Sequence, residues 1–442
     1  MTLTYRGKAG RFLSEKGVED YDLVLVETDR LSLRGRVIPR PEIFDDRHLV
    51  IKLDNGYNVG ISIDNIKNLK ILEKGWRRRE PEIPRMEPKK GLPYVPMVVT
   101  GGTISSRVDY RTGGVRAYER PEELLDIVPE IADIANIDYK PLFAEFSENL
   151  TAEHWVKIAE AAAKELNSGA SGVLVAHGTD TMHYSAAAVS FLMKNLRKPV
   201  VFVGAQRSID RPSTDAVLNL IASVRVATSE IGEVVIVMHG SSSDEFAWVI
   251  RGVKARKMHT SRRDAFLPIN SMPIAKVTRE GIEYLSEFRR RDDSLKVEVD
   301  PKMDDRVFLL YVWPGMDPEI VRMIEDLDYH GLVVAGTGLG HTPYRLIKEL
   351  ERLVRRGIPV VMTSQTLFGR VNLRVYETGR LLLKAGVIPG EDMLPEVALV
   401  KLMYVLGHTR DMEEVRRLMT TNIAGEISRS ISMKSFPPCW VS

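Results

Sequence analysis

Val175-Ala176-His177-Gly178-Thr179-Asp180-Thr181-Met182 stands between a predicted strand and a predicted helix. The strand is the apolar run 172–176, whose valine and leucine residues suit a strand that is buried on both faces. The helix is predicted over 185–196, since apolar residues recur on one face at Ala188, Phe191, Leu192 and Leu196. Thr179 and Asp180 would then lie at the carboxyl end of a parallel strand, where α/β proteins usually bind ligands. Both residues are also good helix N-caps, so the motif alone leaves two interpretations open.

Length and composition indicate a globular protein of more than one domain. The chain has 442 residues, which is too long for one hydrophobic core, and 44% of them are hydrophobic. Its 62 basic and 60 acidic residues give a net charge of +2, so no global field attracts nucleic acid or a membrane. The single cysteine, Cys439, excludes an intramolecular disulfide and a metal site built from cysteines. With neither a signal-peptide pattern nor an apolar run of membrane-spanning length, we expect a cytoplasmic protein.

The first 75 residues differ from the rest of the chain. Residues 21–27 and 48–64 alternate between apolar and polar side chains, and Asp54-Asn55-Gly56 is a hairpin-turn signal inside the second run. We therefore predict a small β-barrel domain of SH3-like size over 1–75. Residues 76–96 are rich in proline and arginine and should form an exposed linker. Its three consecutive arginines fit a solvated linker better than a phosphate contact.

From Met97 onwards, predicted strands alternate with predicted helices, which indicates an α/β fold with parallel sheets. We predict a larger α/β domain over 97–290 and a smaller one over 303–440, with the charged segment 279–293 as a connector. The predicted strands are 97–100, 172–176, 200–203, 234–238, 308–312, 332–335 and 360–362, and the further helices are 152–166 and 344–355.

Polar residues that suit catalysis gather in four segments, each placed where the chain leaves a predicted strand. These segments are 100–105, 177–181, 203–213 and 256–263. A threonine hydroxyl is a poor nucleophile until a base removes its proton. A neutral lysine amine can act as that base, and Lys257 is the candidate for Thr103 or Thr179. Asp180 would hold the lysine or orient a substrate ammonium group.

Other kinds of site fit this sequence less well. Its histidines at 177, 183, 239, 259 and 341 lack the spacing of metal ligands. The sequence has neither a Gly-x-Ser-x-Gly elbow nor a phosphate-binding P-loop. Gly336-Thr337-Gly338-Leu339-Gly340 misses the dinucleotide-binding spacing and should form a tight turn.

Taken together, Thr-Gly-Gly-Thr-Ile at 100–104, His-Gly-Thr-Asp-Thr-Met at 177–182 and Lys-Met-His-Thr at 257–260 resemble the L-asparaginase/glutaminase family. The resemblance begins near Met97 and keeps the family's order and spacing. It implies a larger N-terminal and a smaller C-terminal α/β domain, with dimers or multiples of dimers as the assembly. On this resemblance we expect a homodimer core.

Finer features resemble one branch of that family, the glutaminase subunits (D subunits) of archaeal glutamyl-tRNA(Gln) amidotransferases. These features are the leading β domain, the segments 107–113 and 206–208, and the long motif 257–266. The resemblance implies that the chain releases ammonia from glutamine. A partner, the E subunit of the amidotransferase, would use ATP and Mg²⁺ to amidate Glu-tRNA(Gln), and this chain itself would hold no cofactor or metal.

The family's site residues can be carried over by motif position. Thr103 matches the threonine usually taken as the nucleophile. Thr179, Asp180 and Lys257 match the set that activates the hydroxyl or water and binds substrate. The substrate-binding candidates are Ser147, Glu148 and Tyr110, with Tyr118 as the alternative loop tyrosine. Glu148 stands where the family usually has glutamine or serine, so the resemblance does not fix how the substrate's α-amine is recognised.

Two alternatives to a tRNA-dependent glutaminase remain at this point. One is a free-standing L-asparaginase with an unrelated β domain, which would prefer asparagine to glutamine. The other is a scaffold that keeps the fold and binds amino acid or RNA without catalysis.

Overall fold

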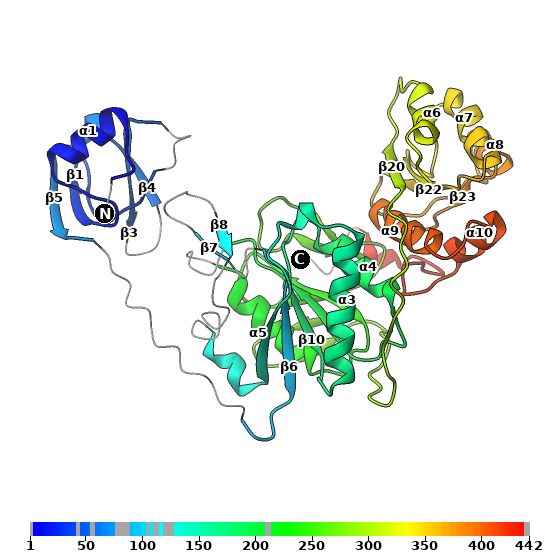
Figure 1. Cartoon of the computed structure of the whole chain (residues 1–442), viewed down its shortest axis with the longest axis horizontal. Helices are drawn as coiled ribbons and strands as arrows, with labels where there is room; N and C mark the ends of the chain where they lie inside the picture. The colour runs from blue at the N-terminus through cyan, green and yellow to red at the C-terminus, as the bar shows by residue number, and fades with distance from the viewer. Residues whose placement is uncertain are drawn as a thin grey trace.

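The described residues form an N-terminal body and two α/β bodies (Figure 1). The computed structural model describes residues 3–40, 45–53, 58–75, 89–102, 106–108, 115–117, 128–207 and 214–436. In the described part of the chain, none of the helices combines the length and the apolar character that crossing a membrane requires.

The N-terminal body is an antiparallel sheet with one helix on it. The sheet has five strands in the order β4-β3-β2-β1-β5. Its elements are α1 (Gly7–Glu15), β1 (Leu23–Glu27), β2 (Ser32–Val37), β3 (His48–Leu53), β4 (Asn58–Ser62), η1 (Ile63–Asn65) and β5 (Asn68–Glu73). The predicted pairing of the two halves of 48–64 is confirmed, although the turn at 54–57 lies outside the described residues. That the five strands close into an SH3-like barrel stays a prediction.

Helix α1 was not predicted from the sequence. It contains Gly7 and Gly10, and glycine is a weak helix former, so local propensity argues against a helix here. Tertiary packing decides instead, because Ala9 and Leu13 are fully buried in the apolar core of this body.

The larger α/β body is organised around an eight-stranded sheet in the order β18-β17-β14-β13-β12-β10-β6-β9. Its strands are β6 (Tyr94–Val99), β9 (Asn136–Pro141), β10 (Val173–Ala176), β12 (Val200–Val203), β13 (Val234–His239), β14 (Ala247–Arg251), β17 (Ala275–Val277) and β18 (Ile282–Tyr284). The five strands from β9 to β13 run parallel, as predicted, whereas β14, β17 and β18 extend the sheet antiparallel. Strand β18 lies within 279–293, the segment predicted as a connector, and β6 begins at Tyr94, within the segment predicted as linker.

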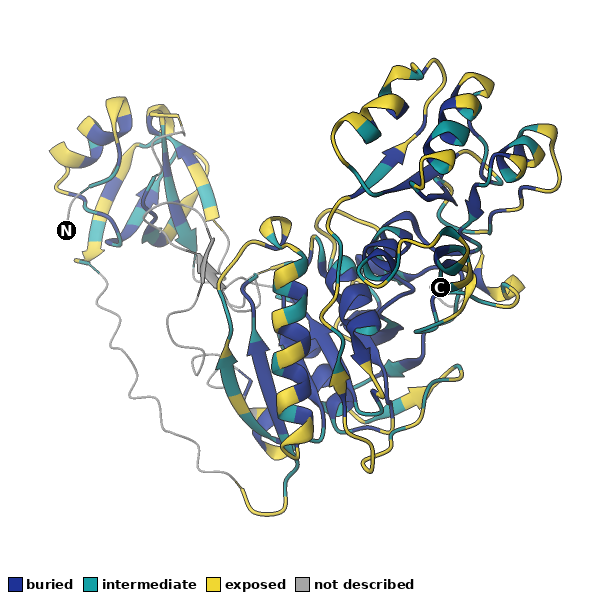
Figure 2. Cartoon of the chain, turned by 45° about the vertical axis from the view of Figure 1, so that its right-hand side comes forward, coloured by how far each residue is buried: buried dark blue, intermediate teal, exposed yellow. Residues whose placement is uncertain are grey.

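Helices cover both faces of this sheet. Val173 and Val175 pack into the core on the side of α3 (Ala152–Asn167) and α4 (Met182–Leu192), and Leu174 and Ala176 pack on the side of α5 (Ala216–Ala227). Strand β10 is therefore buried on both faces, as its composition predicts, and Figure 2 shows the dark blue strands of this sheet between the layers.

Helix α4 differs from its predicted bounds at both ends. It begins at Met182, the last residue of the motif, and ends at Leu192 rather than at Leu196. The helix ends because Met193 takes an extended conformation, and the chain then pairs in β11 (Met193–Lys194) with β19 (Glu298–Val299). Asn195 follows β11 with a left-handed φ of 57°.

The smaller body holds a parallel four-stranded sheet in the order β20-β21-β22-β23. Its elements are β20 (Val307–Tyr311), α6 (Glu319–Asp326), β21 (Gly331–Gly336), α7 (Tyr344–Arg355), β22 (Val360–Ser364), α8 (Glu377–Lys384), β23 (Ile388–Pro389), α9 (Pro395–Leu406), α10 (Met412–Thr420) and η5 (Met433–Ser435). The tight turn predicted after β21 is confirmed by the bridge between Thr337 and His341.

Helix α9 joins the two α/β bodies, because it packs against α4 of the larger one and against β21 of the smaller one. The segment after α10 then folds back on the chain itself. In this segment, Glu426 Oε1 lies 2.6 Å from Lys401 Nζ, and both side chains are fully buried.

Candidate active site

The motif that follows β10 meets a lysine from a distant part of the larger body. Lys257 is the last residue of β15 (Ala255–Lys257), which pairs with β16 (Phe266–Pro268). Its amine donates to Thr179 Oγ1 at 2.9 Å and to Asp180 Oδ1 at 2.6 Å. Thr179 and Lys257 are 78 residues apart in the sequence. The fold therefore brings together the hydroxyl, the carboxylate and the amine that the sequence predicts to act together.

These three groups differ in their access to solvent. Thr179 is buried and the side chain of Lys257 is 9% exposed, whereas that of Asp180 is 69% exposed. The amine thus lies below the surface with its two partners fixed. In this position a neutral amine can accept a proton from the Thr179 hydroxyl, and the Asp180 carboxylate can hold the ammonium that forms.

The glycines of the first two motifs let the backbone segments approach closely. Gly102 has a φ of 87°, and a Cβ atom placed there would lie 2.5 Å from the backbone nitrogen of Gly178. Gly101 has a φ of 116°, and a Cβ atom placed there would lie 2.4 Å from the carbonyl oxygen of Glu145. The turn after β6 and the turn after β10 therefore meet through their backbones, where no side chain fits.

Replacing Gly102 with alanine should reduce kcat/KM by about tenfold or more, because the turn must move to relieve both the contact and the strain of the positive φ. Gly169→Ala is the matched control: Gly169 has a φ of 103° but open space around its Cβ position, so this variant should lose stability, by about 1 kcal/mol, and keep its activity. Steady-state kinetics and thermal unfolding of both variants separate the two effects. Equal kcat/KM in the two variants would contradict the close contact of the turns.

Ser147 also belongs to this cluster. It begins the short helix η4 (Ser147–Asn149), is buried, and lies beside Gly178, where a Cβ atom would come 2.8 Å from its own Cβ. Thr181 Oγ1 donates to the Ser147 carbonyl oxygen at 2.6 Å and fixes the segment to the motif. Glu148 follows in the same helix with an exposed side chain. Thr103, Tyr110 and Tyr118 lie outside the described residues.

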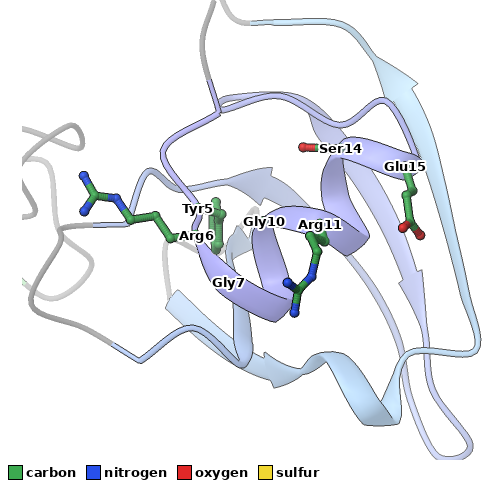
Figure 3. A pocket seen from close by; sticks show the side chains of 7 residues that line it. All are labelled: Tyr5, Arg6, Gly7, Gly10, Arg11, Ser14 and Glu15. Atoms are coloured by element: carbon green, nitrogen blue, oxygen red, sulfur yellow. The ribbon is translucent and has the colours of Figure 1, made fainter.

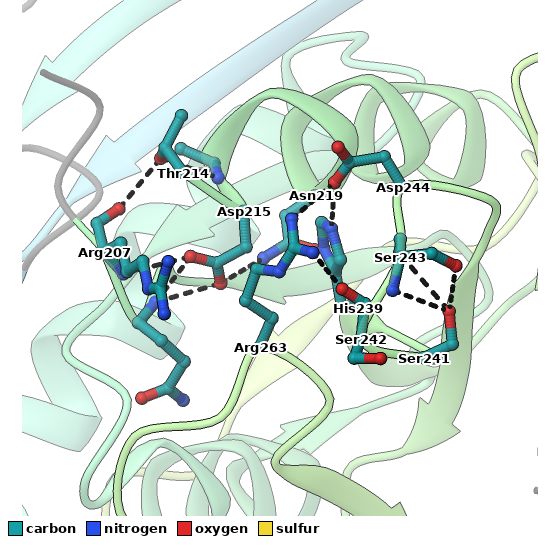
Figure 4. A network of polar contacts seen from close by, with 12 residues as sticks. Arg207, Thr214, Asp215, Asn219, His239, Ser241, Ser242, Ser243, Asp244 and Arg263 are labelled. Atoms are coloured by element: carbon teal, nitrogen blue, oxygen red, sulfur yellow. Dashed lines mark hydrogen bonds and ion pairs between the residues drawn. The ribbon is translucent and has the colours of Figure 1, made fainter. Parts of the chain in front are cut away.

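The third segment reaches the cluster through Gly204, whose Cβ position would lie 2.7 Å from Thr179 Cγ2. The start of its loop is held by Asp215, a fully buried carboxylate that accepts the backbone N–H groups of Gln206 and Arg207 at 2.9–3.0 Å (Figure 4). Asn219 adds a bond to the carboxylate at 3.1 Å and one to the Gly204 carbonyl oxygen at 3.0 Å. Sequence reasoning missed Asp215, although its place just before α5 is a helix-start signal.

The same network continues to the fourth segment. His239, at the end of β13, lies between Asn219 Oδ1 at 2.6 Å and Asp244 Oδ1 at 3.0 Å, and Arg263 contacts the same Asp244 oxygen at 2.8 Å (Figure 4). Burial lowers the pKa of His239, and the bond to Asp244 opposes that shift. These contacts fix the loops of the third and fourth segments relative to each other.

Burial keeps two imidazoles neutral near pH 7: that of His177 in the central motif and that of His183 directly after it. Burial lowers the pKa of His177 to about 4 and that of His183 to about 3. His177 Nδ1 is bonded to the Gly178 carbonyl oxygen at 2.7 Å, which shapes the turn. Among the described side chains of this cluster, Thr179, Lys257 and Asp180 therefore stay the candidates for proton transfer.

A pocket of about 420 Å³ lies apart from this cluster, in the N-terminal body (Figure 3). It is lined by Tyr5, Arg6, Gly7, Gly10, Arg11, Ser14 and Glu15. None of these residues belongs to the four motif segments, so the candidate site rests on the side-chain contacts around Lys257.

Comparison with protein families divides the chain in the same way as the fold. Residues 94–290 match the N-terminal asparaginase domain, residues 306–419 the glutaminase/asparaginase C-terminal domain, and residues 18–72 the GatD N-terminal domain.

Two relatives match almost the whole chain. The D subunit of glutamyl-tRNA(Gln) amidotransferase from Pyrococcus abyssi is 52% identical, over 95% of this chain and 98% of its own length. The D subunit from Pyrococcus horikoshii is 54% identical, over 94% of this chain and 97% of its own. Among solved structures, the thermostable L-asparaginase from Thermococcus kodakarensis superposes with a TM-score of 0.70 at 33% identity, covering 76% of this chain and all of its own.

Proposed function

Since the chain belongs to the family of glutamyl-tRNA(Gln) amidotransferase D subunits, we propose that it releases ammonia from glutamine for the amidation of Glu-tRNA(Gln). The observation that carries this proposal is how much of the chain is matched by the solved asparaginase and how much by the D-subunit relatives. The solved asparaginase is covered in full by 76% of this chain, whereas the D-subunit relatives also match the N-terminal body. A free-standing asparaginase would explain the match to the solved asparaginase but not the match of the N-terminal body.

The partner and assembly follow from this proposal. Glutamine hydrolysis supplies ammonia but no energy for activating a tRNA-bound carboxylate, so a second protein that uses ATP and Mg²⁺ (the E subunit of the amidotransferase) would carry out the amidation. This chain would need no cofactor or metal of its own. A homodimer of the chain would form the core of the complex, which would work in the cytoplasm, where tRNA is charged.

In the proposed reaction, the Thr103 hydroxyl attacks the side-chain amide carbon of glutamine. Thr179 and Lys257 form the proton relay: the lysine amine takes the Thr103 proton through the Thr179 hydroxyl and returns it to the departing nitrogen, which leaves as ammonia. Water then hydrolyses the ester left on Thr103, with the same relay taking its proton, and glutamate is released. Asp180 holds the ammonium form of the lysine by the contact at 2.6 Å. Attack by water in place of Thr103 would use the same relay, so both routes need all three groups.

The remaining groups of the cluster would bind the substrate. Ser147, which is buried beside Gly178, would hold the α-carboxylate of glutamine, and Glu148 and Tyr110 would complete substrate recognition. Negative charge develops on the amide oxygen during attack, and the backbone N–H groups around Gly102 and Gly178 are the proposed donors to it.

The test is ammonia release from glutamine by the purified full-length chain in three states: alone, with its partner subunit, and with partner, ATP and Glu-tRNA(Gln). We expect the rate to rise by about tenfold or more in the complete mixture, because a subunit coupled to a synthetase should hydrolyse little glutamine without its acceptor. Rapid hydrolysis by the isolated chain that neither addition changes, with asparagine preferred to glutamine, would identify a free-standing asparaginase. Full activity of the complex after Lys257 is replaced would identify a non-catalytic scaffold.

A further inference from the structure

A partly buried ion pair between the two α/β bodies lies directly next to the candidate site. Arg256 Nη1 lies 2.7 Å from both carboxylate oxygens of Glu396. Arg256 belongs to β15 in the larger body, and Glu396 lies in the first turn of α9 in the chain that follows the smaller body's sheet. The Glu396 side chain is only 2% exposed, and Arg256 is 25% exposed. None of the roles assigned above uses this pair.

The pair is connected to Lys257 through the geometry of a strand. Consecutive side chains of a strand point to opposite sides, so Arg256 and Lys257 leave β15 in opposite directions. Lys257 points to Thr179 and Asp180, while Arg256 points to α9. A shift of β15 that lengthens the Arg256 contact therefore also displaces the Lys257 amine from Thr179.

Glu396 also contacts the element that carries the other half of the relay. Its Oε1 lies 3.8 Å from Nε2 of His183, which is on α4 close to Thr179 and Asp180. Because burial keeps the His183 imidazole neutral, this contact is polar packing rather than a second ion pair. One carboxylate thus touches both β15 and α4, the two elements that together form the site.

The positive charge of Arg256 stabilises the negative charge of the buried Glu396 carboxylate. Burial alone raises the pKa of Glu396, and the Arg256 guanidinium opposes that shift by stabilising the carboxylate. The positive end of the α9 dipole favours the same charge. Removing Arg256 leaves the buried Glu396 carboxylate without its counter-charge, and removing Glu396 leaves the partly buried guanidinium without its own, so the local structure should rearrange.

We propose that Arg256 and Glu396 are positioning residues, which hold β15 against α4 so that the Lys257 amine stays in hydrogen-bond contact with Thr179. This inference rests on the proposed function, since the relay is the one assigned there. It adds that the smaller body is part of the catalytic architecture, although it contributes none of the relay groups.

A second ion pair between the same bodies is a matched control. Lys254 Nζ lies 2.7 Å from Asp392 Oδ2, and both side chains are almost fully buried. Lys254 precedes β15 and is three residues from Lys257, and its contact is with Asp392 rather than with Thr179 or Asp180. A purely structural role for ion pairs at this interface predicts that the two pairs behave alike.

The experiment compares Glu396→Gln with Asp392→Asn in the full-length chain assembled with its partner subunit, because each change removes one buried charge without changing shape. We expect Glu396→Gln to lower kcat for glutamine by about tenfold to a hundredfold, with KM within about threefold, since misplacement by 1 Å has effects of this size. Asp392→Asn should keep kcat within about twofold while lowering the melting temperature. Equal kcat in the two variants would overturn the proposal.

Rescue adds a second comparison. Arg256→Gln should lose as much kcat as Glu396→Gln, the double variant should lose no more than either, and Arg256→Lys should recover at least about half of the loss on a logarithmic scale. Independent, additive losses would contradict a shared positioning role. Should Glu396→Gln fail to fold, Arg256→Lys against Arg256→Gln still provides the test.

The wild-type protein separates this inference from the proposed function. If it releases no ammonia from glutamine or asparagine, the proposed function fails. The positioning role can then be tested without substrate, by measuring the rate at which acetic anhydride modifies the Lys257 amine. The Lys257 side chain is 9% exposed. That rate should rise at least about threefold in Glu396→Gln and stay unchanged in Asp392→Asn, because only the first releases β15. The same rate in both variants would overturn the inference.

Discussion

Replacing Lys257 with methionine should reduce the glutaminase kcat by about a thousandfold or more. Methionine keeps most of the side chain's length and apolar stem but cannot accept or return a proton. The amine is the only group that contacts both Thr179 and Asp180 in the described part of the chain, at 2.9 and 2.6 Å. Because both bonds vanish together, the relay loses its base and the threonine loses its activating contact.

Lys194→Met is the control for this variant. Lys194 is on the same body and is paired with Asp300 at 2.5 Å, but its side chain is 51% exposed. It should keep kcat within about twofold, since exposed ion pairs contribute little. Ammonia release measured under saturating glutamine, with both variants in the assembled complex, gives the comparison. A Lys257→Met complex that retains a tenth of the wild-type rate would exclude the amine as the base.

Replacing Thr179 with valine should reduce kcat by about a hundredfold to a thousandfold, with little change in stability. Valine matches the shape of threonine, and Thr179 is buried against Gly204, so the packing is kept while the hydroxyl is removed. The Lys257 amine then keeps Asp180 but has no hydroxyl through which to pass a proton.

The variant Thr179→Ser separates the effect of the hydroxyl from the effect of the side chain's shape. Thr179→Ser should recover the rate to within about tenfold of the wild type, because it restores the oxygen that accepts from Lys257. Thr228→Val is the control, since the hydroxyl of Thr228 bonds only locally, to the Arg225 carbonyl oxygen at 3.0 Å. Thr179→Ser and Thr179→Val with the same kcat would show that the hydroxyl takes no part in the reaction.

The central site was predictable because its residue types are rare in combination and its strands are regular. An apolar strand that ends in Gly178, Thr179 and Asp180 places these side chains at the carboxyl edge of a parallel sheet. The position of Lys257 was harder to predict, because nothing in the sequence around β15 indicates that it lies at that edge of the sheet. Lys257 is 78 residues from Thr179 in the sequence. Only its motif, read with the others, linked it to the threonine.

What escaped prediction depends on tertiary contacts that leave no periodic pattern. Helix α1 forms against its glycine content because Leu13 is buried. Beyond β13, strands β14 and β18 each pair antiparallel with the preceding strand of the sheet through a short connection, which needs no crossover helix. Asp215 and Glu396 look like ordinary helix-start residues in the sequence. Their roles appear only once the fold shows Asp215 accepting a loop backbone and Glu396 accepting Arg256.

The most direct test of the proposed site is to label the assembled complex with a diazoketone analogue of glutamine and to map the adduct by mass spectrometry. An activated hydroxyl should react with such an analogue, whereas an ordinary one does not. We predict an adduct on Thr103, formed at least about tenfold more slowly in Lys257→Met. An adduct on a residue outside the peptides that carry Thr103 and Thr179, or a rate that Lys257→Met leaves unchanged, would contradict the site described here.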